Sequence, residues 1–201
     1  MFAPLDEKEE QALLDAAAGT GARREAALRR IYEVLRAPVL KLCLTMSKSP
    51  SDAEDATQET FAAAFRALSL FRRDARLSTW VFRIAVRAAI EQRSKHKATV
   101  ELDPETPSAT SGESDLLARD EARRMLSAIQ CLSLEHRTVL ALFGVEGLRH
   151  REIADVLGVP EGTVWSRLSL ARKALTAEMN RPRLAFSANG LRGGKLPRAA
   201  E

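Results

Sequence analysis

The chain has 201 residues, of which 45% are apolar and 5% aromatic, and it carries a formal net charge of +4 at pH 7. Runs rich in Ala, Leu, Arg and Glu, with little β-branched alternation, predict an all-α protein with room for two small helical domains. No stretch approaches about eighteen uninterrupted apolar residues, and the N-terminus is acidic, so we expect a cytoplasmic protein without membrane insertion or a secretion signal.

The residue types that support catalysis and metal binding are scattered. Cys43 and Cys131 each lie in an apolar helical pattern and are predicted to be reduced core residues. His96, His136 and His150 show no local spacing with a nucleophile and an orienting acid. We therefore expect a non-catalytic protein with no metal site and no cofactor.

Residues 24–97 are predicted to form a first helical domain. Pro38 is expected to interrupt its first helical stretch, because proline inside a helix removes a hydrogen bond and clashes with the preceding turn. The predicted helices are Arg24–Leu35, Val39–Ser47, Ser51–Leu68 and Thr79–Lys95.

The third of these helices has two distinct faces. Ser51 and Glu54 have the spacing of a capping box. The predicted inner stripe consists of Thr57, Phe61, Ala64, Phe65 and Leu68. An acidic ridge, defined as Asp52, Asp55, Gln58 and Glu59, lies away from this stripe. Favourable electrostatics at the helix N-terminus explain Asp52 and Glu54 but not Glu59, so a protein partner with a basic surface is the second interpretation.

Positive charge is concentrated at residues 66–97, where nine Lys and Arg residues face two Asp and Glu residues. The polar loop Phe71–Ser78 supplies Arg72, Arg73 and Arg76. The following helix, capped by Ser78 or Thr79, places an aromatic ring and two guanidinium groups on one face, a combination that suits unpaired bases. These residues are Trp80, Arg83 and Arg87. The alternatives are a core role for Trp80 and an ordinary solvated basic surface.

Two segments have the composition of flexible chain. Residues 98–118 contain five acidic residues, no basic residue and two prolines, which predicts an acidic linker. Residues 181–201 are basic and contain three glycines, which predicts a disordered tail. The linker separates the first domain from a second domain at 119–178.

The second domain contains the pattern of a helix-turn-helix over Leu148–Leu175. Ile153 and Leu157 put one face of its first helix inward, and Gly158 suits the left-handed conformation that ends a helix. Pro160 then stands where the second helix can begin.

The second helix of this motif is amphipathic. Its predicted inner residues are Val164, Leu168, Ala171 and Leu175. The outward residues are Trp165, Ser166, Ser169, Arg172 and Lys173, with Arg167 on the flank. This arrangement predicts a DNA-reading helix. A helical hairpin that is packed for stability alone is the other interpretation.

Three sequence segments, taken together and in order, resemble a known family. They are DAEDATQETFAAAFRAL, FRRDARLSTWVFRIAVRAAIE and RTVLALFGVEGLRHREIADVLGVPEGTVWSRLSLARKAL. They resemble domains two and four of extracytoplasmic-function sigma factors, the compact group of the sigma-70 family, over residues 24–97 and 119–178. The resemblance implies two helical domains and a non-catalytic subunit that directs core RNA polymerase to specific promoters and initiates transcription.

The resemblance also implies roles for individual residues. The acidic ridge would dock on the clamp helices of the polymerase β′ subunit, and the linker would thread through polymerase channels, with the β subunit as a further contact. The loop arginines Arg72, Arg73 and Arg76, together with Trp80, Arg83 and Arg87, would capture the non-template strand of the minus-ten element. The minus-thirty-five contacts would come from Gly162, Thr163, Trp165, Ser166, Arg167, Arg172 and Lys173. An anti-sigma protein is an implied partner.

The sequence departs from the family pattern at three positions. Arg87 stands where Asn is frequent, Trp165 where Lys or Arg is usual, and Leu170 where a second Arg is frequent. Promoter preference is therefore not transferable from relatives. Two alternatives stay open: a sigma-like adaptor without promoter recognition, and a stand-alone helix-turn-helix regulator, which usually carries an α/β receiver domain that this sequence lacks.

Overall fold

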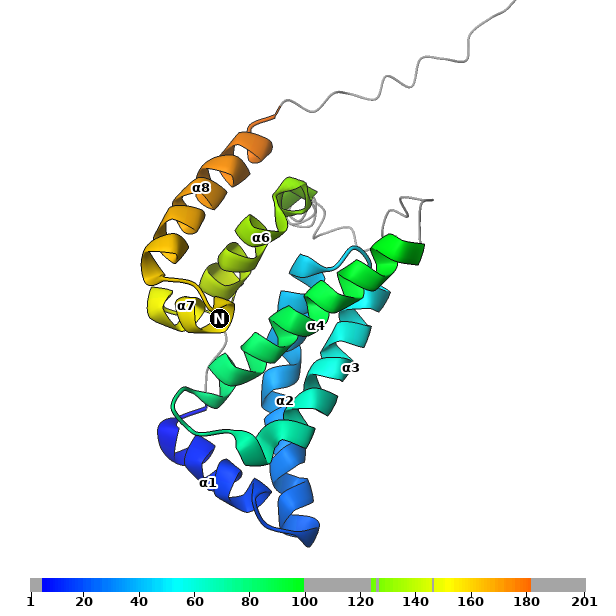
Figure 1. Cartoon of the computed structure of the whole chain (residues 1–201), viewed down its shortest axis with the longest axis vertical. Coiled ribbons are helices and arrows are strands. Elements are labelled where there is room, and N and C mark those ends of the chain that lie inside the picture. The colour runs from blue at the N-terminus through cyan, green and yellow to red at the C-terminus, as the bar shows by residue number, and fades with distance from the viewer. Residues whose placement is uncertain (1–4, 100–123, 126, 146, 182–201) are drawn as a thin grey trace, which may run out of the picture.

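The computed structural model describes residues 5–99, 124, 125, 127–145 and 147–181, and all regular elements within them are helical (Figure 1). The N-terminal elements are α1 (Glu7–Ala17), α2 (Gly21–Met46), α3 (Pro50–Ala67), the 3-10 turn η1 (Leu68–Leu70) and α4 (Leu77–Thr99). The C-terminal elements are α6 (Leu134–Leu140), the π-helical segment η3 (Ala141–Val145), α7 (His150–Leu157) and α8 (Glu161–Met179). The all-α prediction is confirmed. The predicted linker and tail lie almost entirely outside the described residues.

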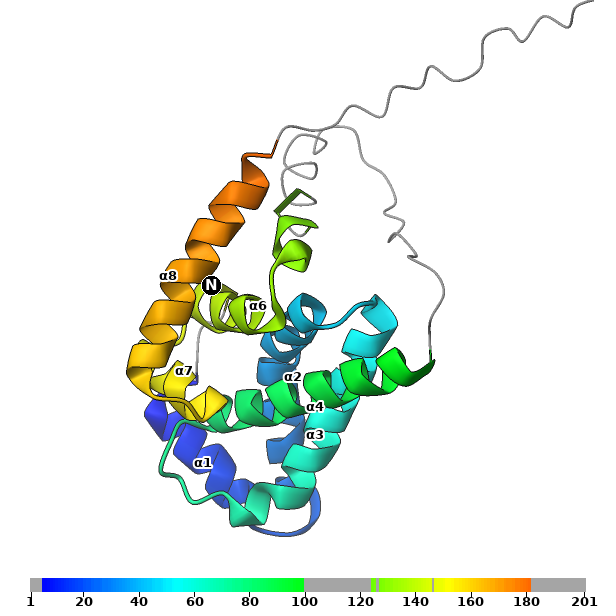
Figure 2. The same cartoon turned by 45° about the horizontal axis from the view of Figure 1, so that its top comes forward.

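The helices α2, α3 and α4 lie side by side around one aliphatic core, and α1 packs against α2 (Figures 1 and 2). Ile31 and Leu42 from α2 and Phe82 from α4 are at most 1% exposed at its centre. The sequence prediction missed α1. The sequence feature that marks the start of α1 is Asp6, whose carboxylate accepts a hydrogen bond from the Glu9 backbone N–H at 2.7 Å and so caps the helix.

Helix α2 runs unbroken through Pro38, so the predicted interruption is wrong. An internal proline costs about 3 kcal/mol. Leu35, Val39 and Leu42 flank it and are at most 1% exposed, and burying each such side chain contributes roughly 1.5–3 kcal/mol. Tertiary packing on both sides of Pro38 therefore outweighs the local penalty.

Helix α3 begins earlier than predicted. Ser49, not Ser51, is its N-cap, and the Ser49 Oγ accepts a hydrogen bond from the Asp52 N–H at 3.1 Å. Pro50 occupies the first helical position, which lacks an intrahelical partner for its nitrogen in any case. The prediction of a capping box at Ser51 and Glu54 is therefore wrong. The inner stripe is confirmed, with only Phe65 partly exposed.

The two groups of helices share one continuous core. Helix α7 packs against α4, and α6 packs against α2 (Figure 2). We call this the closed arrangement. Cys43 is buried as predicted, but Cys131 is exposed, because it ends the helical residues 127–131 just before Ser133 begins α6. A bilayer-spanning helix is absent from the described part of the chain.

Candidate nucleic-acid and partner interfaces

The helix-turn-helix forms as the sequence predicts. Gly158 adopts a left-handed conformation (φ +65°), and its N–H donates to the Ala154 carbonyl at 2.8 Å, which ends α7. Pro160 is the N-cap of α8. Val164, Leu168 and Ala171 are buried, and Leu175 is partly buried. The turn is therefore fixed by local backbone geometry and by one apolar stripe.

The outer face of α8 is exposed, as predicted for Trp165, Ser166, Ser169, Arg172 and Lys173. Gly162 at the helix start is also exposed, and Thr163 is partly exposed. These residues leave α8 with one polar, basic surface available to a ligand.

Side chains from three segments form a column across this face. The Trp165 and His150 rings stack with centroids 4.0 Å apart and planes 4° apart. The His150 and Phe143 ring centroids are 5.5 Å apart, and the Arg172 guanidinium lies 4.7 Å from the Phe143 ring centroid. The column orients Trp165 and Arg172 before any ligand arrives. Sequence reasoning missed Phe143 and His150, because no periodicity links these positions.

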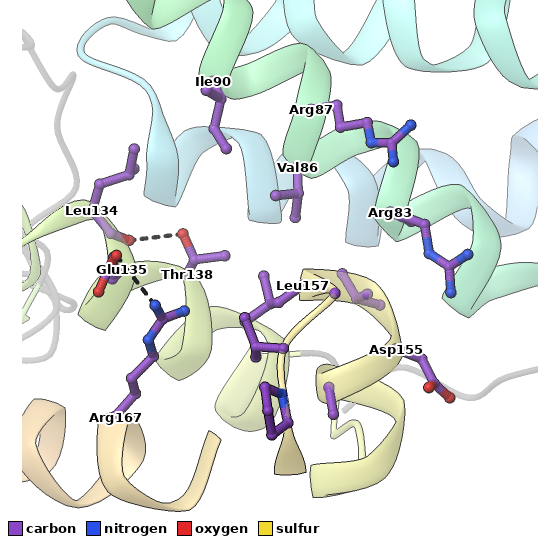
Figure 3. Close-up of a pocket in the computed structure, with 15 residues that line it drawn as sticks. Arg83, Val86, Arg87, Ile90, Leu134, Glu135, Thr138, Asp155, Leu157 and Arg167 are labelled. Atoms are coloured by element: carbon purple, nitrogen blue, oxygen red, sulfur yellow. Dashed lines mark hydrogen bonds and ion pairs between the residues drawn. The ribbon is translucent and has the colours of Figure 1, made fainter. Parts of the chain in front are cut away.

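A cleft of about 820 Å³ is lined by residues of α4, α6, α7 and α8 and of the turn between α7 and α8. Figure 3 shows Arg83 and Arg87 extending from α4 and Arg167 extending from α8 on the opposite side. Arg167 pairs with Glu135 at 3.2 Å and is partly buried, so it points into the cleft and away from the outer face of α8. Two predicted minus-ten arginines and one predicted minus-thirty-five arginine thus share one cavity.

The floor of this cleft is apolar. Val86 and Ile90 of α4 lie opposite Leu157 of α7 (Figure 3). Val86 is buried, Leu157 is partly buried, and Ile90 is 46% exposed. Apolar side chains of α4 and α7 therefore face one cleft in the closed arrangement, next to the basic residues of α4.

Trp80 has a structural contact as well as a partly exposed surface. Its ring lies 5.0 Å from the Phe71 ring, at an interplanar angle of 36°. Arg83 is partly exposed and Arg87 is exposed. The predicted common face of Trp80, Arg83 and Arg87 is therefore accessible in part, and the core role of Trp80 accounts for the rest of its ring.

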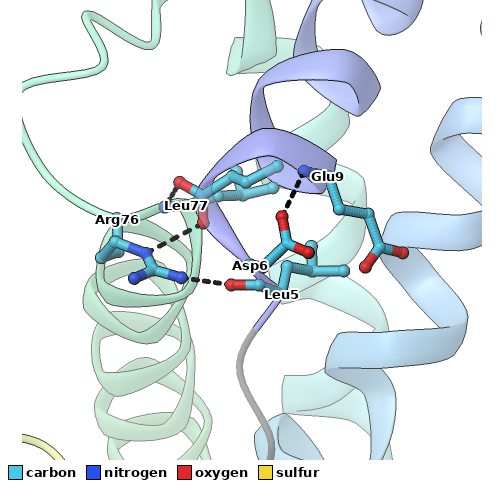
Figure 4. Close-up of polar contacts among 6 residues, drawn as sticks. Leu5, Asp6, Glu9, Arg76 and Leu77 are labelled. Atoms are coloured by element: carbon cyan, nitrogen blue, oxygen red, sulfur yellow. Dashed lines mark hydrogen bonds and ion pairs between the residues drawn. The ribbon is translucent and has the colours of Figure 1, made fainter.

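Two of the three loop arginines make contacts with the N-terminal helix. The Arg76 Nε lies 3.2 Å from Glu10 Oε2, and its terminal nitrogen donates to the Leu5 carbonyl (Figure 4). Arg73 has a left-handed backbone (φ 58°) and pairs with Asp15 at 2.7 Å. Arg72 is exposed and has no such pair among the described residues.

Helix α4 begins at Leu77, so neither Ser78 nor Thr79 caps it; both are buried in its first turn. The Leu77 N–H donates to Glu10 Oε1 at 2.8 Å. A carboxylate from α1 thus serves as the partner that a local cap normally provides. Because the contact spans 67 positions in sequence, no local pattern signals it.

The acidic ridge is exposed only in part. Asp55, Gln58 and Glu59 face solvent, and Glu59 pairs with Arg66 at 3.0 Å. Asp52 is 9% exposed, so the prediction that it shares this surface is wrong. It lies in the first turn of α3. No group of three or more His, Cys, Asp or Glu side chains among the described residues is placed to hold a metal ion.

These features define a two-part helical protein with one basic, partly aromatic helix and a separate helix-turn-helix. The description "Sigma-70 region 2" matches residues 31–99, and "Sigma-70, region 4" matches residues 122–175. The RNA polymerase sigma-H factor of Pseudomonas aeruginosa is 33% identical over 150 residues, covering 68% of this chain and 78% of the relative. The extracytoplasmic-function (ECF) sigma factor SigM of Mycobacterium tuberculosis is 34% identical over 138 residues, covering 67% and 68%.

Two solved structures share the fold. CnrH in complex with the cytosolic domain of CnrY has a TM-score of 0.64 at 24% identity and covers 84% of this chain and 96% of that one. The sigma factor RpoE of Bartonella quintana in complex with the anti-sigma factor NepR has a TM-score of 0.64 at 22% identity. This match covers 75% of the present chain and 95% of that one.

The chain belongs to the sigma-70 family, in its ECF group. It is an RNA polymerase sigma factor, a subunit that directs core polymerase to promoters. Sigma factors are non-catalytic subunits of that enzyme. The stand-alone regulator is not supported, because the match includes region 2 as well as the helix-turn-helix.

Proposed function

We propose that this sigma factor binds core polymerase through the exposed part of its acidic ridge. The observation that carries the proposal is the surface of α3, where Asp55, Gln58 and Glu59 face solvent while the opposite side of the helix is buried in the core. Carboxylates on a rigid helix suit a basic protein partner, and such pairs contribute chiefly orientation and association rate. The β′ clamp helices are the partner implied by the family resemblance.

Promoter recognition would use both basic elements. Arg72, Trp80, Arg83 and Arg87 would hold the unpaired minus-ten strand, by stacking and by contacts to phosphate. Arg73 and Arg76 would act mainly by shaping the loop, because both are engaged with α1. The minus-thirty-five element would meet the outer face of α8, from Gly162 to Lys173, with Arg172 held by Phe143.

The closed arrangement has to open for both contacts to form at once. The minus-ten and minus-thirty-five elements lie roughly 25 base pairs apart, or about 85 Å at 3.4 Å per base pair. In the closed arrangement Arg83 and Arg87 share a cleft with Arg167 of the DNA-reading helix. We infer that binding to polymerase separates α7 from α4. A cytoplasmic anti-sigma protein that holds the domains away from polymerase is a further proposed partner.

Reconstitution with core RNA polymerase tests this function. Transcript starts mapped from a promoter-fragment library are expected to share two spaced upstream elements. Core binding without initiation would instead identify a sigma-like adaptor. DNA binding without any association with polymerase would overturn the proposal, since the acidic ridge would then have no polymerase partner.

A further inference from the structure

A second cavity, of about 670 Å³, lies where the junction of α2 and α3 meets α4 and the residues around α6. Among the described residues, its lining includes three cationic side chains and no carboxylate. Lys48 comes from the junction between α2 and α3, Arg93 comes from α4, and Arg137 comes from α6. Both halves of the protein therefore contribute positive charge to one space.

Arg137 is the most deeply placed of these cations, at 4% exposure. It donates one hydrogen bond to Gln130, but its Nε has no hydrogen-bond partner. Burial lowers the pKa of Arg137, and the nearby charge of Arg93 lowers it further. An arginine keeps its charge in proteins, so a buried guanidinium beside another cation calls for a compensating anion.

No carboxylate of the described residues lines this cavity. Arg93 makes a hydrogen bond at 3.4 Å with the Met46 carbonyl, and neither Arg93 nor Arg137 has a carboxylate within ion-pair distance in the described ranges. Asp52, in the adjacent first turn of α3, does not line the cavity.

A second polar group in the lining is also unsatisfied. Ser47 is 4% exposed, and its Oγ has no hydrogen-bond partner. Ser47 lies just before Ser49 and Pro50, which begin the 18-residue helix α3 and also line the cavity. The positive end of the helix dipole therefore adds to the charge of the three cations. A buried hydroxyl, a buried guanidinium nitrogen and a helix N-terminus all favour the same kind of ligand.

We propose that this cavity binds a phosphate-class anion that carries a pyrophosphate group, either free or attached to a nucleoside. Planar guanidinium groups match phosphate oxygens with paired hydrogen bonds, and Ser47 can donate a further one. The cavity, at about 670 Å³, has room for more than a single phosphate, because one water molecule occupies only about 30 Å³ in the liquid. Three cations match the charge of a pyrophosphate better than that of a single monoanion.

Such a ligand would couple to the arrangement of the two halves. Because Arg93 comes from α4 and Arg137 from α6, a ligand that contacts both binds the closed arrangement more tightly than an open one. Binding would thus shift the population toward the state that keeps α7 on α4. This consequence rests on the proposed function, whereas the anion site itself does not.

Calorimetric titration of the full chain with pyrophosphate, at fixed near-physiological ionic strength, tests the site. Saturable one-to-one binding is expected. Arg93→Gln should weaken pyrophosphate binding about tenfold or more, because it removes one charge-assisted hydrogen bond worth about 1.4 kcal/mol. Arg29→Gln, the same charge change at an exposed position of α2 outside the cavity, should change it less than about twofold.

A parallel titration with ADP distinguishes a nucleotide from free pyrophosphate, and tighter binding of either assigns the source. Arg137→Lys is a second variant of the cavity. Arg93→Gln leaves the buried Arg137 in place, so it still tests the site if Arg137→Lys misfolds. Absence of saturable binding, or equal weakening by Arg29→Gln, would overturn the proposal. Binding seen only after the five acidic residues between 101 and 115 are neutralised would assign the cavity to the chain's own carboxylates and also overturn it.

Discussion

Replacing Glu10 by alanine tests how the N-terminal helix supports α4. The Glu10 side chain is 12% exposed, and it accepts from the Leu77 N–H at 2.8 Å and from the Arg76 Nε at 3.2 Å. Leu77 is 1% exposed, so the substitution leaves a buried N–H without its partner. That loss costs about 1–3 kcal/mol. The ion pair adds only about 0.5 kcal/mol, because the Arg76 side chain is 40% exposed.

The expected total is a loss of about 1.5–3.5 kcal/mol in the free energy of unfolding, measured by urea denaturation. Hydrogen exchange should locate the effect: the Leu77 amide is expected to exchange about tenfold faster or more, since 1.4 kcal/mol corresponds to a factor of ten. Glu9→Ala is the matched control. Glu9 pairs with Arg30 on the surface, with side chains 41% and 52% exposed, so its removal should cost less than about 1 kcal/mol.

Equal costs for the two variants would refute this reasoning. So would an unchanged exchange rate at Leu77 in Glu10→Ala, because the carboxylate would then not be the partner that protects this amide. Glu10→Gln should recover most of the stability, since its amide oxygen can still accept from Leu77.

Three further predictions concern the interfaces and the core. Asp55→Arg should abolish binding to core polymerase in a pull-down, while Glu54→Arg, an equal charge change on another side of α3, should retain most of it; normal binding by Asp55→Arg would place the interface elsewhere. Phe143→Leu should lower transcription from promoters that depend on the upstream element by about two- to fivefold, because Arg172 loses a cation–π contact of roughly 0.5–1 kcal/mol; an unchanged rate would argue against the column. Burial raises the pKa of the Cys43 thiol from 9.0 to about 11, so the thiol of the unfolded chain loses its proton at a lower pH than that of the folded chain. The free energy of unfolding should therefore fall by up to about 2.7 kcal/mol as the pH rises from 9.0 to about 11. Cys43→Ala should flatten that decline in denaturation experiments at a series of pH values.

Sequence patterns predicted the elements whose stability is local. The helix-turn-helix followed from the apolar spacing of Val164, Leu168 and Ala171 and from Gly158, whose left-handed conformation the structure contains. The same reasoning failed at Pro38, where contacts from other helices decide the outcome.

Contacts between distant segments set the remaining details of the candidate sites. Glu10 reaches Leu77 across 67 positions, and Phe143 meets Arg172 across the turn of the motif. Neither contact leaves a periodic signal, because each depends on how finished helices pack. Asp52 illustrates the same limit: helical periodicity predicted its angular position on α3, but its burial depends on how the other helices pack against α3.

The two faces of α4 connect the fold to the proposed promoter contact. Phe82 and Val81 anchor the helix in the core, while Val86 and Ile90 face the helix-turn-helix beside Arg83 and Arg87. With Arg83 and Arg87 as the proposed minus-ten contacts, DNA and α7 would compete for the same side of one helix. Binding of polymerase that separates the halves would free this side, and by thermodynamic linkage DNA held on α4 would favour the separated state to the same degree. A chain that is closed 99 times in 100 would lose about a hundredfold in apparent DNA affinity, so closure alone is sufficient to make promoter binding depend on polymerase.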